Sequence, residues 1–125
     1  MRHLRPAQVV ELGSGSSSHV IDTARRRNEE DGSPCEHRVF DPYPWEATVL
    51  GPVAGATVVP LGARAVDVSE FEALGRDDIL FVDTTHTVKT GGDVNRIVLE
   101  LLPRLAPGVL VHFHDIFLPY EYPRS

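Results

Sequence analysis

The fold is decided by the stretch VVELGSGSSS, residues 9–18. A short apolar run ends near an acidic residue, turns through Gly-x-Gly and enters a segment with helical character. Gly13 and Gly15 allow the backbone to turn sharply and to approach a ligand that a Cβ atom would hold away. The first amide groups of the following helix point back toward the strand end. The stretch therefore predicts a strand, a tight turn and a helix that together bind a nucleotide-like ligand.

Two residues of this stretch argue against a dinucleotide. Ser18 stands where the Gly-x-Gly-x-x-Gly fingerprint has its third glycine. Glu11 lies at the strand end. A dinucleotide has no special need for a carboxylate at this position, whereas a ligand with a positive charge would be stabilised by one. Glu-x-Gly-x-Gly after a first strand resembles motif I of the class I S-adenosylmethionine-dependent methyltransferases.

The composition limits the classes of protein that the chain can represent. Its 125 residues suffice for one domain with a single core. The net charge of -6 opposes binding to nucleic acid. No apolar run approaches the roughly 20 residues that span a bilayer, and no secretory segment follows Met1, so we expect no membrane partner. Cys35 is the lone cysteine, which excludes an internal disulfide and favours a reducing, cytoplasmic setting.

Apolar runs alternate with helix-like segments along the whole chain. We expect strands at residues 8–12, 36–40, either 56–59 or 63–66, 79–83 and 109–113, and helices at 16–30, 45–50, 69–74 and 92–105. This alternation predicts an α/β fold, a parallel, doubly wound sheet of about five strands with helices on both faces.

An acidic residue lies at or just past the end of each expected strand. These acids are Glu11, Asp41, Asp67, Asp83 and Asp115. Ligands of such sheets bind beyond the carboxyl ends of the strands. Asp41 is placed to accept hydrogen bonds from both hydroxyls of a ribose; the alternative is an Asx-turn before Pro42, and we favour the ligand role. Asp67 is equally well explained as a turn residue.

A second polar group follows the last two strands. If these strands are neighbours, their ends lie about 4.8 Å apart, and Asp83, His86, His114 and Asp115 converge. Carboxylates and imidazoles at this spacing suit Mg²⁺ or Mn²⁺. They equally suit a general base, with Asp83 orienting His86 or His114. His112 alternates with His114 and is expected to face the helix layer.

Two further blocks resemble one bacterial branch of the class I methyltransferases, which acts on small molecules. They are ILFVDTTHTVKTGGDV at 79–94, and LPRL at 102–105 with VHFHDIFLPYEYP at 111–123. The resemblance implies a Rossmann-like domain, with its parallel strands in the order 3-2-1-4-5, that binds S-adenosylmethionine. It assigns Glu11, Gly13, Ser14 and Gly15 to the methionine end, Asp41 to the ribose, Asp67 and Val68 to the adenine, and Asp83 to the same cofactor site. In macrocin O-methyltransferase-like enzymes, metal-binding acids occupy the positions of Asp83 and Asp115, although His114 stands where that group usually has another aspartate.

The resemblance also shows what the chain lacks. The family's sheet continues with a helix and an antiparallel strand pair, and without them the strand at 109–113 becomes an unpaired edge. We therefore expect either a fragment or a minimal enzyme that forms a homodimer through this strand or through the aromatic tail at 116–122.

The expected reaction is methyl transfer to an oxygen, less readily to a nitrogen, of a small-molecule acceptor, with His86, His114 and Asp83 as the catalytic residues. The alternatives are a non-catalytic S-adenosylmethionine-binding module that needs a partner chain and, disfavoured by Ser18 and Glu11, a nicotinamide dehydrogenase.

Overall fold

A computed structural model describes residues 1–44 and 50–116 of the chain. The helix expected at 45–50 falls on residues 45–49, outside the described part, and so does the tail after Ile116. The strands are β1 (Gln8–Leu12), β2 (Glu36–Phe40), β3 (Thr57–Val59), β4 (Ile79–Val82) and β5 (Leu110–Phe113). The helices are α1 (Ser16–Glu30), α2 (Ser69–Glu72) and α3 (Asp93–Arg96), and α3 continues as a π-helical segment (Ile97–Leu101) and a 3₁₀ turn (Leu102–Arg104).

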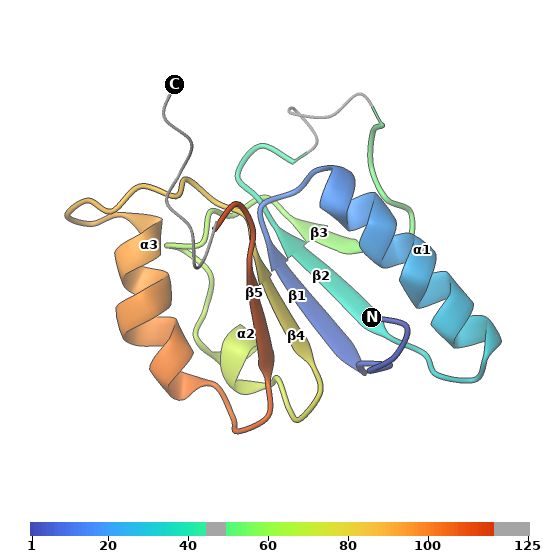
Figure 1. Cartoon of the computed structure of the whole chain (residues 1–125). Coiled ribbons are helices and arrows are strands. Elements are labelled where there is room, and N and C mark those ends of the chain that lie inside the picture. Colours follow the sequence, from blue (N-terminus) through green and yellow to red (C-terminus); the bar gives the residue numbers. More distant parts are fainter. Residues whose placement is uncertain (45–49, 117–125) are drawn as a thin grey trace.

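The strands form one parallel sheet in the order β3-β2-β1-β4-β5 (Figure 1). β1 pairs with β2 on one side and with β4 on the other, so that Glu11 lies between Val39 and Phe81. The α/β class, the parallel sheet and the strand order are confirmed. The third strand is the earlier of its two expected alternatives, because residues 63–66 lie in the loop after β3.

One face of the sheet carries most of the core. Here Val10, Leu12, Leu80 and Val82 contribute to a cluster that also contains buried residues of α2, of the π-helical segment and of the loops: Phe71, Leu74, Ile97, Leu101, Ala63 and Val66. Burying side chains of this size stabilises a fold by about 1.5–3 kcal/mol each. This face is therefore the one that holds the domain together.

The opposite face is covered only in part. Helix α1 lies across β1 and β2 (Figure 1), where Val9, Ile21 and Cys35 form a smaller buried cluster. Burial raises the pKa of the Cys35 thiol to about 11. Ile79 and Phe81 of β4 pack against this cluster, and the ring of Phe81 stacks on that of His112 with the centroids 4.7 Å apart. His112 lies on this face as expected and lines a groove together with Val20 and Ile21 of α1, and its side chain is exposed there.

The helix expected at 92–105 is regular only at its start. Gly92 caps α3 with extended backbone, and after Arg96 the helix widens and then tightens before Leu105. Pro103 explains the tight end, because a proline has no N–H to donate to the preceding turn. The expected apolar stripe is present nevertheless, since Ile97 and Leu101 have no exposed surface.

Candidate functional site

A cavity of about 430 Å³ lies at the carboxyl ends of the central strands. Its walls come from the turn after β1, the segments after β2 and β3 and the long loop after β4, and include Gly13, Asp41, Gly62, Asp83, Lys89 and Asp93. It thus lies where the chain passes from β1 outward to β2 and, later, to β4 on the other side. Parallel sheets bind their ligands at such a reversal of strand order.

The two glycines of the first turn have different roles. Gly13 has a φ of 91°, and a Cβ placed on it would lie 1.8 Å from the backbone oxygen of Asp83. The fold itself therefore requires this glycine, for which the sequence suggested a sharp turn and room for a ligand. Gly15 has a φ of 173°, which any residue adopts. A Cβ on Gly15 would meet no atom of the described chain within 4 Å.

Asp41 joins the first two strand ends. Its Oδ2 accepts hydrogen bonds from the backbone N–H and the hydroxyl of Ser14, both at 2.7 Å. Its Oδ1 accepts one from the N–H of Tyr43 at 2.8 Å, which is the Asx-turn. Since a carboxylate has about four acceptor positions, Oδ1 keeps room for one more donor. Asp41 thus both forms the Asx-turn and lines the cavity.

Glu11 does not line the cavity. Its side chain has no exposed surface; Oε1 accepts a hydrogen bond from the Ser17 hydroxyl at 2.7 Å, and Oε2 lies 2.9 Å from His37 Nε2. The expectation that Glu11 faces the methionine end does not agree with this geometry. The acid instead ties β1 to β2 and to the first turn of α1, directly beneath the glycine turn.

Asp67 and Val68 also lie away from the cavity. Asp67 Oδ1 accepts hydrogen bonds from the N–H and hydroxyl of Ser69 at the start of α2, and these bonds hold the pKa of Asp67 below its usual value. The adenine assignment of these two residues stays a prediction that the lining of this cavity does not support. Because β3 ends at Val59 and not at residue 66, Gly62 and Ala63 are the residues that its carboxyl end brings to the cavity wall. Choosing the earlier strand boundary would have found them in the sequence.

The acids and histidines after β4 and β5 come together, as the sequence predicts. His86 Nε2 lies 3.1 Å from Asp83 Oδ1, and His114 Nδ1 lies 3.7 Å from Asp83 Oδ2. His114 Nδ1 is also 3.0 Å from Asp115 Oδ1. The pairing of β4 with β5 places Val82 opposite Phe113, so the two loops begin side by side. Asp83 lies at the centre of this cluster.

The loops that carry the cluster have strained backbone. His86 and Asp115 have φ values of 53° and 57°, a left-handed conformation that costs non-glycine residues about 1–3 kcal/mol. Asp93, at the start of α3, holds the first loop by accepting hydrogen bonds from Thr85 N at 3.1 Å and Thr85 Oγ1 at 2.7 Å. Burial alone would raise the pKa of Asp93, but hydrogen bonds from Thr85 and Thr84 outweigh it, and the pKa is lowered. Such strain is typical of functional loops.

Three residues of the cluster have the spacing of metal ligands. One carboxylate oxygen each of Asp83 and Asp115 and one ring nitrogen of His114 lie within 4.8 Å of one another. All three side chains remain accessible, between 36% and 59% exposed. The set is one nitrogen and two oxygens, which suits Mn²⁺ and, less closely, Mg²⁺. The geometry thus accommodates a divalent ion, and His86 lies outside the set.

Comparison with known proteins gives one match. No curated protein and no solved structure matches the chain significantly. No helix of the described part is long and apolar enough to cross a membrane. A family model described as a methyltransferase domain matches residues 10–116, which include the end of β1, all the later strands and the whole acid and histidine cluster. The chain therefore belongs to this methyltransferase domain family, whose methyl donor is S-adenosylmethionine.

Proposed function

We propose that the chain transfers the methyl group of S-adenosylmethionine to an oxygen of a small molecule. The position of Asp83 carries this proposal. Its backbone oxygen lies against Gly13 in the cofactor turn, and its carboxylate lies 3.1 Å from His86 Nε2. A single residue thus joins the wall of the cavity to an acid–base pair, which is what a transfer reaction between two bound molecules needs.

The cavity fits the cofactor. Its volume lies within the range of about 300–1,000 Å³ that small-molecule sites occupy. The open space at Gly15 and the free acceptor position of Asp41 Oδ1 are both available to a ligand. Ser14, Gly15 and Asp41 would hold its methionine and ribose parts, and Gly62 and Ala63 its adenine. When bound, the cofactor supplies a methyl group activated by the sulfonium charge.

The residues after β4 and β5 supply the proton transfer. A hydroxyl acceptor is a weak nucleophile until it loses its proton, and a neutral imidazole of His86 or His114 can take that proton. Asp83 lies beside both rings, where its carboxylate orients them and stabilises the imidazolium that forms. Since this base assists a hydroxyl more than an amine, we favour an oxygen acceptor over a nitrogen acceptor.

A metal-assisted form of the same reaction is the alternative that the cluster supports. Mg²⁺ or Mn²⁺ held by Asp83, Asp115 and His114 would lower the proton affinity of a bound hydroxyl without a histidine base. EDTA distinguishes the two forms. It should abolish turnover if the ion is required, with recovery on adding Mn²⁺ or Mg²⁺, and should leave turnover unchanged if His86 or His114 is the base.

Calorimetry and a turnover screen test the proposal as a whole. We expect S-adenosylmethionine and S-adenosylhomocysteine to bind and NAD not to bind. Turnover is then measured over a panel of phenols, sugars and amines. Binding of NAD in place of S-adenosylmethionine would contradict the cofactor assignment. Tight cofactor binding without turnover of any panel member would favour the non-catalytic module that needs a partner chain.

A further inference from the structure

Asp83 lies beside two imidazole rings, and its contacts with them differ. His86 Nε2 is 3.1 Å from Asp83 Oδ1, which is within hydrogen-bonding distance. His114 Nδ1 is 3.7 Å from Asp83 Oδ2, beyond that distance, and lies closer to Asp115 Oδ1, at 3.0 Å. A hydrogen bond to one ring nitrogen decides which nitrogen of a neutral histidine carries the proton. Asp83 therefore fixes the ring of His86 and does not fix that of His114 in the same way.

The backbone on both sides of His86 is held by the hydroxyl of Thr85. His86 has a φ of 53°, a conformation that persists in a residue with a Cβ only where the surroundings impose it. Thr85 Oγ1 donates a hydrogen bond to Asp93 Oδ1 at 2.7 Å and accepts one from the N–H of Thr87 at 3.3 Å. The Thr87 hydroxyl donates in turn to Thr85 O at 3.0 Å. These hydrogen bonds enclose His86 in a short ring that is attached to Asp93.

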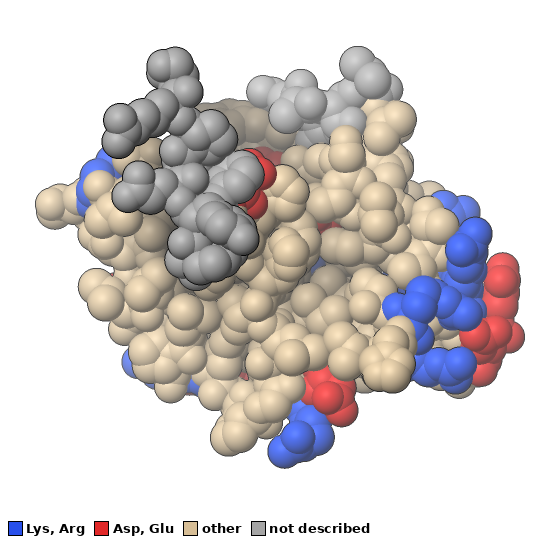
Figure 2. Space-filling view, viewed as in Figure 1, with Lys and Arg blue, Asp and Glu red and all other residues tan. Residues whose placement is uncertain are grey.

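Asp93 is a firm point of attachment because it is buried at the start of α3. It is 8% exposed, and its Oδ2 also accepts the N–H of Thr85 at 3.1 Å. Figure 2 shows a more common arrangement, in which red acidic atoms lie beside blue basic atoms at the margins of the molecule. Within residues 1–44 and 50–116 no Lys or Arg pairs with Asp93, whose hydrogen bonds come from threonines. Because burying a carboxylate costs free energy that these bonds must offset, the carboxylate and the threonine loop hold each other in one geometry.

We propose that Asp93 is a positioning residue that acts through Thr85 to hold His86 against Asp83, so that His86 and not His114 is the base. The role of the base rests on the proposed methyl transfer, whereas the positioning does not. Because Nε2 donates its proton to Asp83, Nδ1 of His86 carries the lone pair that takes the proton of the acceptor hydroxyl. In that step the Nδ1–H bond forms as the O–H bond breaks, and the electron pair of the O–H bond stays on the oxygen.

NMR of the ring nitrogens tests the positioning without a substrate. Well above the ordinary imidazole pKa of about 6.5, the nitrogen shifts distinguish the two neutral tautomers. We expect His86, assigned by the signals lost in His86→Ala, to show the Nε2–H form alone. Thr85→Val removes the hydroxyl at nearly constant shape, and Asp93→Asn removes one of the two carboxylate acceptors. Both should move the His86 signals toward those of the exposed His3, where two tautomers exchange, whereas Thr85→Ser should leave them in place.

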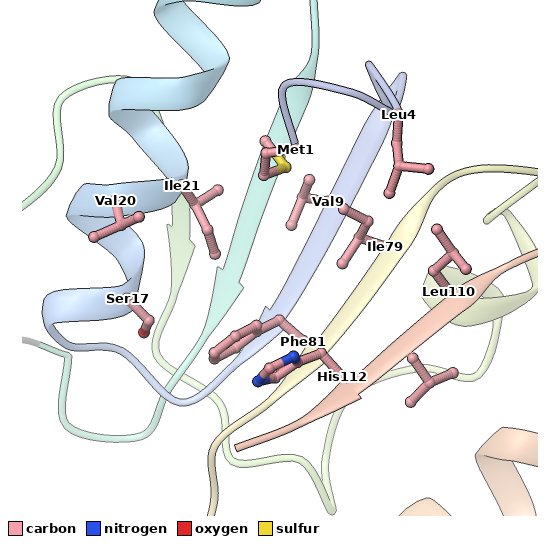
Figure 3. A pocket seen from close by; sticks show the side chains of 11 residues that line it. Met1, Leu4, Val9, Ser17, Val20, Ile21, Ile79, Phe81, Leu110 and His112 are labelled. Atoms are coloured by element: carbon pink, nitrogen blue, oxygen red, sulfur yellow. The ribbon is translucent and has the colours of Figure 1, made fainter. Parts of the chain in front are cut away.

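Two controls separate positioning from a general loss of structure. The ring of His112 stacks on Phe81 in a separate apolar groove (Figure 3), so its signals should stay the same in every variant. Asp78 is also buried, and accepts the backbone N–H of Gly75 at 2.9 Å, at the opposite end of β4 from the cluster. Asp78→Asn should therefore lower the melting temperature and leave the signals of His86 unchanged.

Melting temperatures test whether Asp93 imposes the strained backbone. At a φ of 53° glycine is favoured over alanine, so His86→Gly should melt about 3 °C or more above His86→Ala, although both lose the ring. When each change is combined with Asp93→Asn the loop can relax, and the difference should shrink to less than about 1 °C. A difference of the same size in both backgrounds would overturn the role of Asp93.

Turnover separates this proposal from the methyl transfer on which it rests. With an acceptor found among the phenols, sugars and amines, Thr85→Val should lower kcat at least about tenfold and change KM for S-adenosylmethionine by less than about twofold. Unchanged kcat with altered His86 signals would overturn His86 as the base. If no acceptor is methylated, the proposed function fails, while the ring signals and melting temperatures still decide the positioning. Unaltered His86 signals in both Asp93→Asn and Thr85→Val would overturn it.

Discussion

The strand ends on the two sides of the cavity use their polar groups differently. After β1 and β2, Glu11 is paired with His37 and Ser17, and Asp41 with Ser14 and Tyr43. After β4 and β5, Asp83, His114 and Asp115 are accessible and lie near one another on strained loops. The hydrogen bonds of the first region hold the turn in place, whereas the acids and histidines of the second region contact one another at the surface. Changes in the first should therefore affect stability, and changes in the second activity.

The largest expected effect is at Gly13. Gly13→Ala places a Cβ 1.8 Å from the backbone of Asp83 at a φ of 91°, so the turn and the end of β4 cannot both keep their positions. We expect the free energy of unfolding to fall by about 4 kcal/mol or more, measured by urea denaturation.

Gly15→Ala is the matched control for that change, because it meets no described atom and should alter stability by less than about 1 kcal/mol. Weaker binding of S-adenosylmethionine to a stable Gly15→Ala variant would show that the ligand occupies this space. Equal stability of the two variants would contradict the assigned role of Gly13.

The buried pair beneath the turn comes next. Glu11→Ala leaves His37 and the Ser17 hydroxyl without their acceptor inside the protein, and such losses cost about 3–5 kcal/mol. Glu11→Gln keeps one acceptor oxygen and should cost less. Thermal denaturation of the two variants measures the difference. If Glu11→Ala were as stable as the wild type but failed to bind cofactor, the acid would contact the ligand after all.

Substitutions in the cluster after β4 and β5 should change the activity and leave the stability nearly unchanged. If a histidine is the base, His86→Ala or His114→Ala should lower kcat by about 10²- to 10⁴-fold, while the free energy of unfolding changes by less than about 1 kcal/mol. Asp83→Asn should impair turnover in either form of the reaction. If a metal is required, Asp115→Ala should be impaired as well.

His3→Ala, an exposed histidine at the other end of the chain, is the control for these activity measurements. Full activity in all the variants of the cluster would place the site elsewhere.

The smallest expected effect is the pH dependence of stability that Asp93 contributes. Its pKa is lowered in the folded chain, so its contribution to stability is present above the ordinary carboxyl pKa of about 3.9 and is lost as the pH falls through the lower, folded value. The contribution should be about 1 kcal/mol. In Asp93→Asn, the loss of unfolding free energy that comes from protonating Asp93 should disappear. Urea denaturation between pH 5 and 3 measures it, and identical pH dependence in both proteins would refute it.

The sequence alone determined the fold class, and its resemblance to a known family supplied the strand order. Short apolar runs alternate with helical stripes, and Gly-x-Gly after the first run allows a tight turn, so the parallel sheet follows from the local pattern. The convergence of Asp83, His86, His114 and Asp115 was also predictable, since each follows a strand whose neighbour the order specifies. These features depend on period and position along the chain, which a sequence states directly.

Only the tertiary structure decided which partners the side chains after β1 and β2 contact. Whether Glu11 faces a ligand or His37 depends on the register of β1 with β2, and the need for glycine at position 13 depends on the end of β4, seventy residues away. The end of β3, likewise, decided between Asp67 and Gly62 at the cavity. Contacts between distant segments settle these choices, because a side chain's burial and hydrogen bonds depend on residues that local periodicity does not specify.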